Sequence, residues 1–266
     1  MLKMKNKRKK SPLILNPLRI VGQSLDEEIQ GVVNSEALAI FLIPFLVIGF
    51  TIYNWLLWYQ IITIPNPLIL TFFSIFLSIY SLFRFFKVRN NIRSLRLGRD
   101  GERAVGQTLD SLRKSGYRVF HDLVGQGFNI DHVLVSEYGV FCIETKTFSK
   151  PEKGECKVIV TEEGISINGF KSDRKILIQA EAQKAWLEKQ ITKLTGIKLT
   201  VKPVVVFPGW FIENRYKGSN VWVLEPKALP GFIRNESKIF TDEQVKLISN
   251  QMSLYIRGTY NDLNAR

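Results

Sequence analysis

The chain has 266 residues, 45% of them hydrophobic, and a net charge of +13. That length allows one or two domains. Its two cysteines, Cys142 and Cys156, exclude a disulfide framework and match no zinc-ligand spacing. So few cysteines suggest a reducing compartment, and the apolar surroundings of Cys142 predict a buried thiol.

Two apolar stretches precede residue 97, near which the chain divides. Residues 37–59 contain no charged side chain, and residues 68–83 form a second uncharged run that Pro65 and Pro67 separate from the first. A helix needs about 20 apolar residues to cross a bilayer. We therefore predict a transmembrane hairpin over residues 37–86. The alternative, a pair of buried soluble helices, is disfavoured because neither run has a polar face.

Basic residues flank this hairpin. Residues 1–96 hold 12 Lys and Arg against 4 Asp and Glu, and the remaining residues hold 25 against 20. The turn at residues 63–66 has no Lys or Arg, so the positive-inside rule places both termini in the cytoplasm, with the chain in the inner or cell membrane. The N-terminus does not read as a cleavable signal, because its apolar stretch begins too late and is too long. Most of the charge excess favours an anionic lipid bilayer as partner.

The chain order predicts four segments. They are a basic cytoplasmic segment at 1–36, the hairpin at 37–86, a basic linker at 87–97 and a soluble domain at 98–266. In the soluble domain, hydrophobic periodicity predicts helices after residue 102 to about 114, at 176–194 and at 241–256, and strands at 117–123, 157–160, 165–167, 202–207 and 221–224, with a β-hairpin at 129–148. This order indicates an α/β fold with a mixed sheet flanked by helices.

The hairpin at 129–148 carries charged residues among apolar ones. Its two halves alternate with period two around a turn at 136–139, so Asp131 shares a face with the valines of its strand, and Glu144 and Lys146 share a face on the next. Burying three charges is costly unless they pair or hold a metal. Two carboxylates and an ammonium suit metal-assisted phosphodiester hydrolysis, in which acids hold Mg²⁺ and a lysine orients water or stabilises phosphate charge. The alternative is a structural salt bridge between Lys146 and one of the acids.

Other polar residues fall near this pattern. Glu102 lies three residues before Val105, on the apolar face of its helix, where it could meet the hairpin's acids; ordinary complementation of the helix dipole is the alternative. Gln179 and Gln183 lie on or beside the apolar stripe of the helix at 176–194, as core amides or as groups facing a polar site. His132 should point away from Asp131, which indicates a structural role, and His121 gives no functional signal.

Four motifs in this order resemble one family. They are Gly98-x-x-Gly101-Glu102, Ile130-Asp131-His132-Val133, Gly139-Val140-Phe141-x-Ile143-Glu144-Thr145-Lys146 and Gln179-Ala180. Together they resemble the nuclease-related domain (NERD) family of the restriction-endonuclease-like, PD-(D/E)XK superfamily, over roughly residues 98–210.

The resemblance implies a nuclease site. Asp131 and Glu144, with the Thr145 carbonyl, would bind Mg²⁺, or Mn²⁺ in its place. Lys146 would position the attacking water or stabilise developing charge, Glu102 would hold water or a second metal, and Gln179 would contact phosphate or the lysine. Gln179 fits the family pattern better than Gln183, which is then a buried amide.

The function this implies is a membrane-anchored, Mg²⁺-dependent endonuclease acting on DNA or another nucleic acid, in DNA processing or defence. The alternatives are a binding or signalling module on the same fold and a membrane scaffold that recruits partners through residues 211–266. Trp210, Phe211 and Trp222, at the start of that tail and within it, could stack on bases, but core packing is the better interpretation.

Overall fold

The computed structural model describes residues 18–60, 67–125, 127–151, 154–170, 172–216 and 218–265, and their side chains except those of 37, 38, 60 and 260–265. The basic residues at 3–10 and the turn at 63–66, on which the topology prediction partly depends, lie outside this range. The chain separates into two compact units. Of the described residues, 22–101 and 147–149 form one unit, and 18–21, 102–146 and 150–265 form the other.

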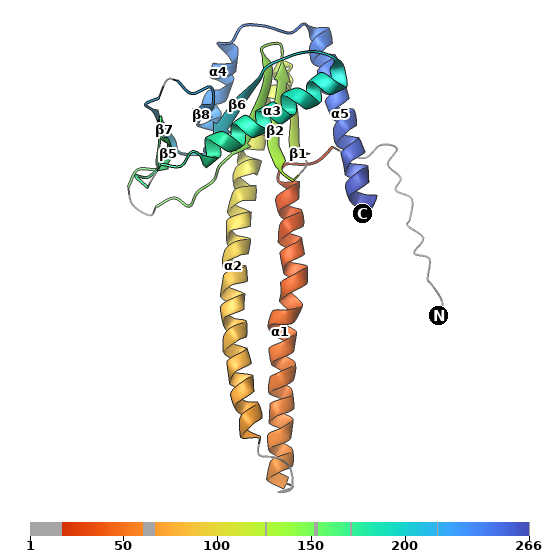
Figure 1. Cartoon of the computed structure of the whole chain (residues 1–266), viewed down its shortest axis with the longest axis vertical. Coiled ribbons are helices and arrows are strands. Elements are labelled where there is room, and N and C mark those ends of the chain that lie inside the picture. The colour runs from red at the N-terminus through yellow and green to blue at the C-terminus, as the bar shows by residue number, and fades with distance from the viewer. Residues whose placement is uncertain are drawn as a thin grey trace, which may run out of the picture. The chain divides into compact units, whose positions relative to one another are not determined.

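The first unit is a helical hairpin of α1 (Gln23–Gln60) and α2 (Leu68–Ser111), which run side by side (Figure 1); the last turns of α2, from Glu102, belong to the second unit. Polar side chains join the two helices: Thr51 and Ser74 share a hydrogen bond of 2.5 Å, and Trp55 donates to Thr71 at 2.7 Å. The most apolar stretch of each helix is only 12% and 11% buried, unlike the core helix of a soluble protein. Both helices are long and apolar enough to cross a membrane.

Helix α2 continues through residues 87–97, which were expected to form a linker, and through the glycine-containing residues 98–101, which were expected to precede a new helix. The sequence predicted a new helix after residue 102, whereas α2 runs without a break from Leu68 to Ser111. A glycine inside a helix costs only about 1 kcal/mol, which favourable packing can offset. Gly101 serves such packing, because a Cβ there would lie 1.8 Å from Oγ1 of Thr147. Helix α1 likewise starts earlier than the apolar run, in residues where the sequence carried no clear signal.

The second unit is built on a five-stranded mixed sheet in the order β1-β2-β3-β6-β8. The strands are β1 (Arg118–Val124), β2 (Asn129–Ser136), β3 (Gly139–Thr145), β6 (Val201–Val206) and β8 (Trp222–Leu224). The first three strands are antiparallel neighbours, and β6 and β8 run parallel to β3. The predicted hairpin is confirmed as β2 and β3, with Ser136 paired to Gly139 at its turn.

Helices cover both faces of this sheet, as the α/β prediction requires. On one face, α3 (Lys175–Thr195) and α5 (Asp242–Ala265) pack on Val133, Val135, Val140 and Cys142. On the other, the last turns of α2 and the short α4 (Leu229–Arg234) pack on Leu134, Phe141 and Ile143. The alternation of these contacts along β2 and β3 gives the two faces of the hairpin different neighbours. Figure 1 shows α3 crossing the strands of this sheet.

A smaller sheet accompanies the main one. It contains β5 (Gly164–Ile167), β4 (Lys157–Thr161) and β7 (Phe211–Asn214) in that order. The sequence predicted β4 and β5 but not β7, which is four residues long, nor α4. The aromatic residues of this region mostly pack in the core, as expected: Trp210 is buried and Trp222 contacts Phe141, whereas Phe211 is exposed.

Candidate active site

Asp131 and Glu144 lie on the same face of the sheet, at the end of the hairpin opposite its turn. Asp131 is the third residue of β2, and Glu144 is the last but one of β3. The alternation that sends Val133 and Cys142 toward α3 sends these two acids to the same side. The carboxylate of Asp131 accepts the backbone N–H of Thr145 at 2.6 Å, which ties the end of β3 to its neighbour. The structure therefore brings the two predicted acids together.

The carboxylate of Glu144 is buried and accepts hydrogen bonds from three side chains. Nζ of Lys146 lies 2.6 Å from Oε1, and Nε2 of Gln179 donates to the same oxygen at 2.8 Å. Lys146 also donates to Oε1 of Gln179 at 3.0 Å, so the lysine, the amide and the carboxylate form a closed triangle. Charge-assisted bonds of this kind are shorter and stronger than neutral ones. The predicted residues Glu144, Lys146 and Gln179 thus form one network.

Gln183 is the residue that sequence reasoning undervalued. Its Nε2 donates to Oε2 of Glu144 at 2.6 Å and to the backbone carbonyl of Asn129 at 2.9 Å, and the side chain is almost fully buried. It is a buried amide, as expected, but one that contacts the central carboxylate. Its spacing of four residues from Gln179 was the available signal, because that spacing places both amides on one helix face. Both glutamines therefore belong to the site.

A second pair of acids lies near the first. Burial raises the pKa of the Glu102 carboxyl to about 8, and the negative charges of Asp122 and Glu144 act in the same direction, against Lys146. Asp122 is itself buried and accepts Nε of Arg19 at 2.8 Å. Its φ of 52° places it in the left-handed region, which Asp tolerates better than most residues. The sequence did not single out Asp122, and it counted Arg19 only among the basic residues before the first predicted span.

Burial and like charge also dominate the titration of Asp131. They raise its pKa well above the usual value, burial first and then the charges of Glu144 and Glu102, while the N–H of Thr145 acts in the opposite direction. Carboxylates that raise each other's pKa repel when all are ionised. A bound cation would offset that repulsion, so the electrostatics of this site suit a positively charged ligand.

The site offers two carboxylates, those of Asp131 and Glu144, as ligands for Mg²⁺. Across the described residues, no three His, Cys, Asp or Glu side chains are arranged to hold a metal ion. A metal here would therefore rest on Asp131 and Glu144 with a further oxygen, which agrees with the preference of Mg²⁺ for one or two carboxylates and retained waters. One buried oxygen beside Glu144, Oε1 of Gln183, has no hydrogen-bond partner. Ligation by the Thr145 carbonyl stays a prediction.

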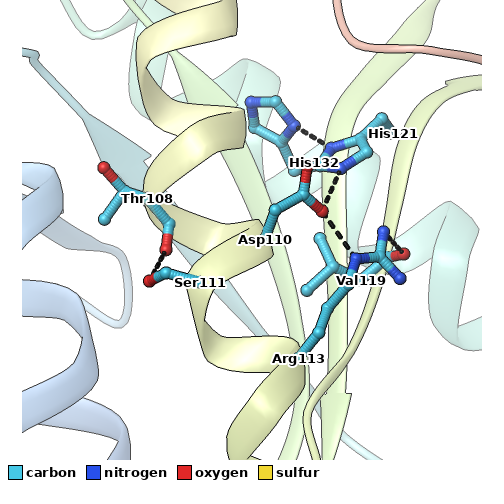
Figure 2. Close-up of polar contacts among 7 residues, drawn as sticks. All are labelled: Thr108, Asp110, Ser111, Arg113, Val119, His121 and His132. Carbon is cyan, nitrogen blue, oxygen red and sulfur yellow. Dashed lines mark hydrogen bonds and ion pairs between the residues drawn. The ribbon is translucent and has the colours of Figure 1, made fainter.

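The histidines lie on the other face of the sheet, as the alternation predicted for His132. Figure 2 shows the two rings joined Nδ1 to Nδ1 at 2.9 Å, with Nε2 of His121 lying 3.1 Å from Asp110, which in turn pairs with Arg113. Burial lowers the pKa of both rings, that of His132 well below its ordinary value. The pair lies away from the acids of the site, and Nε2 of His132 is buried without a hydrogen-bond partner. Two buried rings with lowered pKa values, bonded to each other and to Asp110, indicate a structural role.

A family model described as the nuclease-related domain matches residues 97–208. The match contains every residue of the network from Glu102 to Gln183, but not Arg19. No curated protein and no solved structure matched the chain.

Proposed function

Because residues 97–208 belong to the nuclease-related domain family, we propose that this chain is a membrane-anchored, Mg²⁺-dependent nuclease that hydrolyses DNA phosphodiester bonds. The observation that carries the proposal is the convergence of Asp131, Glu144 and Lys146 from two strands of one hairpin. The family gives the fold, and the arrangement of these charges is what argues for chemistry.

The roles follow from the contacts of each group. Asp131 and Glu144 would hold Mg²⁺, which when bound supplies Lewis-acid polarisation of the phosphate and lowers the pKa of a bound water. Lys146 lies beside Glu144, so its ammonium can orient the attacking water or stabilise charge that develops on the phosphate. Gln179 and Gln183 fix the carboxylate of Glu144, since each donates an amide hydrogen to it.

A structural ion pair between Lys146 and Glu144 is the competing explanation. A structural ion pair needs only one lysine and one acid, because their charges neutralise each other. Here Glu102, Asp122 and Asp131 add further carboxyls, and two of them have strongly raised pKa values. A fold that needed only stability would gain by losing these repelling charges, because replacing buried charges with apolar residues is often neutral or stabilising. Their presence favours a site that a ligand completes.

Membrane anchoring rests on α1 and α2, whose apolar stretches are largely exposed. The basic flanks favour a hairpin with both ends in the cytoplasm, which would leave the nuclease-related domain on the side where DNA is found.

The test is cleavage by the full chain in neutral detergent, on single- and double-stranded DNA, with Mg²⁺, with Mn²⁺ and with chelator. Lys146→Ala should reduce metal-dependent cleavage by about 10²–10³, the typical effect of removing a group that stabilises transition-state charge. Lys175→Ala is the matched control, because that side chain is 87% exposed and its ion pair is with Asp173, which is not one of the acids of the site. Full activity in Lys146→Ala removes the lysine from the mechanism. Binding of DNA without cleavage by the parent would favour the binding-module alternative.

A further inference from the structure

A groove of about 440 Å³ lies between α1 and α2, where the apolar stretches end. Its walls include Ile40 of α1 and Phe85, Val88 and Ile92 of α2. Three arginines of α2 line the same groove: Arg89, Arg93 and Arg96. The groove is therefore amphipathic along its length, apolar toward the predicted spans and cationic beyond them.

The three arginines share one side of α2. Residues spaced by three and four positions are neighbours on a helix surface, so the guanidinium groups follow one another along the groove. They extend over about 10 Å of helix axis at 1.5 Å per residue. That length suits a phosphate-containing headgroup that contacts two cations one turn apart.

These arginines carry uncompensated charge. The arginines on either side of them do have acidic partners in α1, since Arg84 pairs with Glu36 and Arg99 with Asp26. Within the described part of the chain, no acid lies at ion-pair distance from the three groove arginines, and their side chains are exposed. An anionic ligand would therefore gain their attraction without displacing an existing ion pair.

We propose that this groove is a binding site for an anionic phospholipid of the cytoplasmic leaflet, an inference that rests on the proposed membrane anchoring. The acyl chain would lie against Ile40, Phe85 and Val88. The headgroup would lie along Arg89, Arg93 and Arg96, with its phosphate in contact with two of these arginines one turn apart. Basic pockets at the cytoplasmic ends of transmembrane helices suit such headgroups. A nucleic-acid backbone matches the charge but not the apolar wall, which it would leave exposed to water.

The experiment uses the full chain, delipidated in neutral detergent and titrated with dioleoyl phosphatidylglycerol or dioleoyl phosphatidylcholine, with bound lipid counted by native mass spectrometry. We expect saturable binding of phosphatidylglycerol in preference to phosphatidylcholine. Replacing all three arginines with Gln should weaken phosphatidylglycerol binding on the order of 100-fold, since each cation near an anionic lipid contributes a factor of about five. Phosphatidylcholine binding should not change.

Two further variants separate a built site from general charge attraction. Lys87→Gln, Lys189→Gln and Lys198→Gln together remove the same charge from exposed positions outside the groove and should leave the affinity within about twofold. Val88→Trp fills the apolar wall and keeps all three arginines, so it should weaken binding of the diacyl lipid about tenfold or more.

Several outcomes would overturn the inference. They are equal binding of the two lipids, an equal loss in the lysine control, and competition by acyl-free glycerophosphoglycerol at the same concentration as the lipid. Loss of duplex DNA binding in the arginine variant with phosphatidylglycerol binding intact would assign the arginines to nucleic acid instead. Carbonate extraction of membranes tests the anchoring separately. An integral chain with no lipid preference lacks the site but keeps the anchor, and nuclease assays are independent of both results.

Discussion

The buried ion pair between Arg19 and Asp122 predicts that the nuclease-related unit needs residues 18–21 for its stability. Both side chains are only 4% exposed, and Nε lies 2.8 Å from Oδ2. Around this pair, Leu18 packs on the core beneath α5, and Val21 covers Gly106, where a Cβ would lie 2.6 Å from Cγ2 of the valine. Residues 18–21 thus belong to this unit although they precede the family match by more than 70 positions.

Arg19→Met should destabilise this unit strongly. Removing one partner of a buried pair leaves an uncompensated charge and costs about 3–5 kcal/mol. For a unit of this size, 1 kcal/mol corresponds to roughly 2–4 °C in melting temperature, so we expect a fall of about 6–20 °C. Thermal melts of the full chain in detergent, followed by near-UV circular dichroism, measure it. Lys238→Met is the control, because its ion pair with Glu137 is 62% and 38% exposed and should contribute less than about 1 kcal/mol.

A double variant tests whether the cost arises from the stranded carboxylate. Asp122→Asn removes the acid and keeps a residue that tolerates the φ of 52°. Combined with Arg19→Met, it should recover part of the lost stability, and the difference gives a coupling energy for the pair. If Arg19→Met melts within 2 °C of the parent, or if the double variant is less stable than the sum of the single ones, the pair does not stabilise the unit as argued.

Two further predictions concern the acids. The pKa of Glu102 is about 8 in the folded chain against 4.5 in the unfolded chain, so between these values the folded chain keeps a proton that the unfolded chain has lost. In chelator the free energy of unfolding should therefore fall as pH rises from 5 to 8, by at most about 1.4 kcal/mol per pH unit. Glu102→Gln should flatten that pH dependence, and urea titrations in which the variant keeps the parent's pH dependence would contradict the assignment. Asp131→Asn should be at least as stable as the parent in chelator, because one of several repelling charges is gone, and in Mg²⁺ it should lose most of the parent's gain, about 2.7 kcal/mol at a hundredfold excess over the dissociation constant. Thermal melts in both conditions decide this, with the exposed Glu162→Gln as control, and a parent that gains nothing from Mg²⁺ would count against the metal site.

The parts of the site that the sequence predicted are those governed by local periodicity. A period of two fixes the face of Asp131 and Glu144 once the hairpin is recognised, whatever the remainder of the chain does. The same alternation placed His132 on the opposite face, where it meets His121. The two long apolar helices could be predicted for a related reason, since length and apolarity are local properties.

The parts that were missed depend on contacts between distant segments. Arg19 and Asp122 are 103 positions apart, and nothing in either neighbourhood distinguishes them from surface charges. The continuity of α2 was missed because Gly98 and Gly101 resemble a helix start, whereas the structure uses Gly101 to admit Thr147. A glycine can be needed for a turn or for the close approach of another residue, and the sequence does not distinguish these two causes. Only the folded chain shows which of them applies.

The two glutamines show where the limit of such reasoning falls. Helical periodicity places Gln179 and Gln183 on one face, so either could be expected to reach the acids. Which of them does so depends on how deeply α3 packs on the sheet, and this is set by contacts such as those of Leu187 and Ile191 with the core. In the folded chain both amides reach Glu144, one from a more exposed position beside Lys146 and one from the interior. The inner amide can hold the carboxylate in place while the outer one also contacts the lysine, so the two equivalent positions on the helix acquire different roles only through packing.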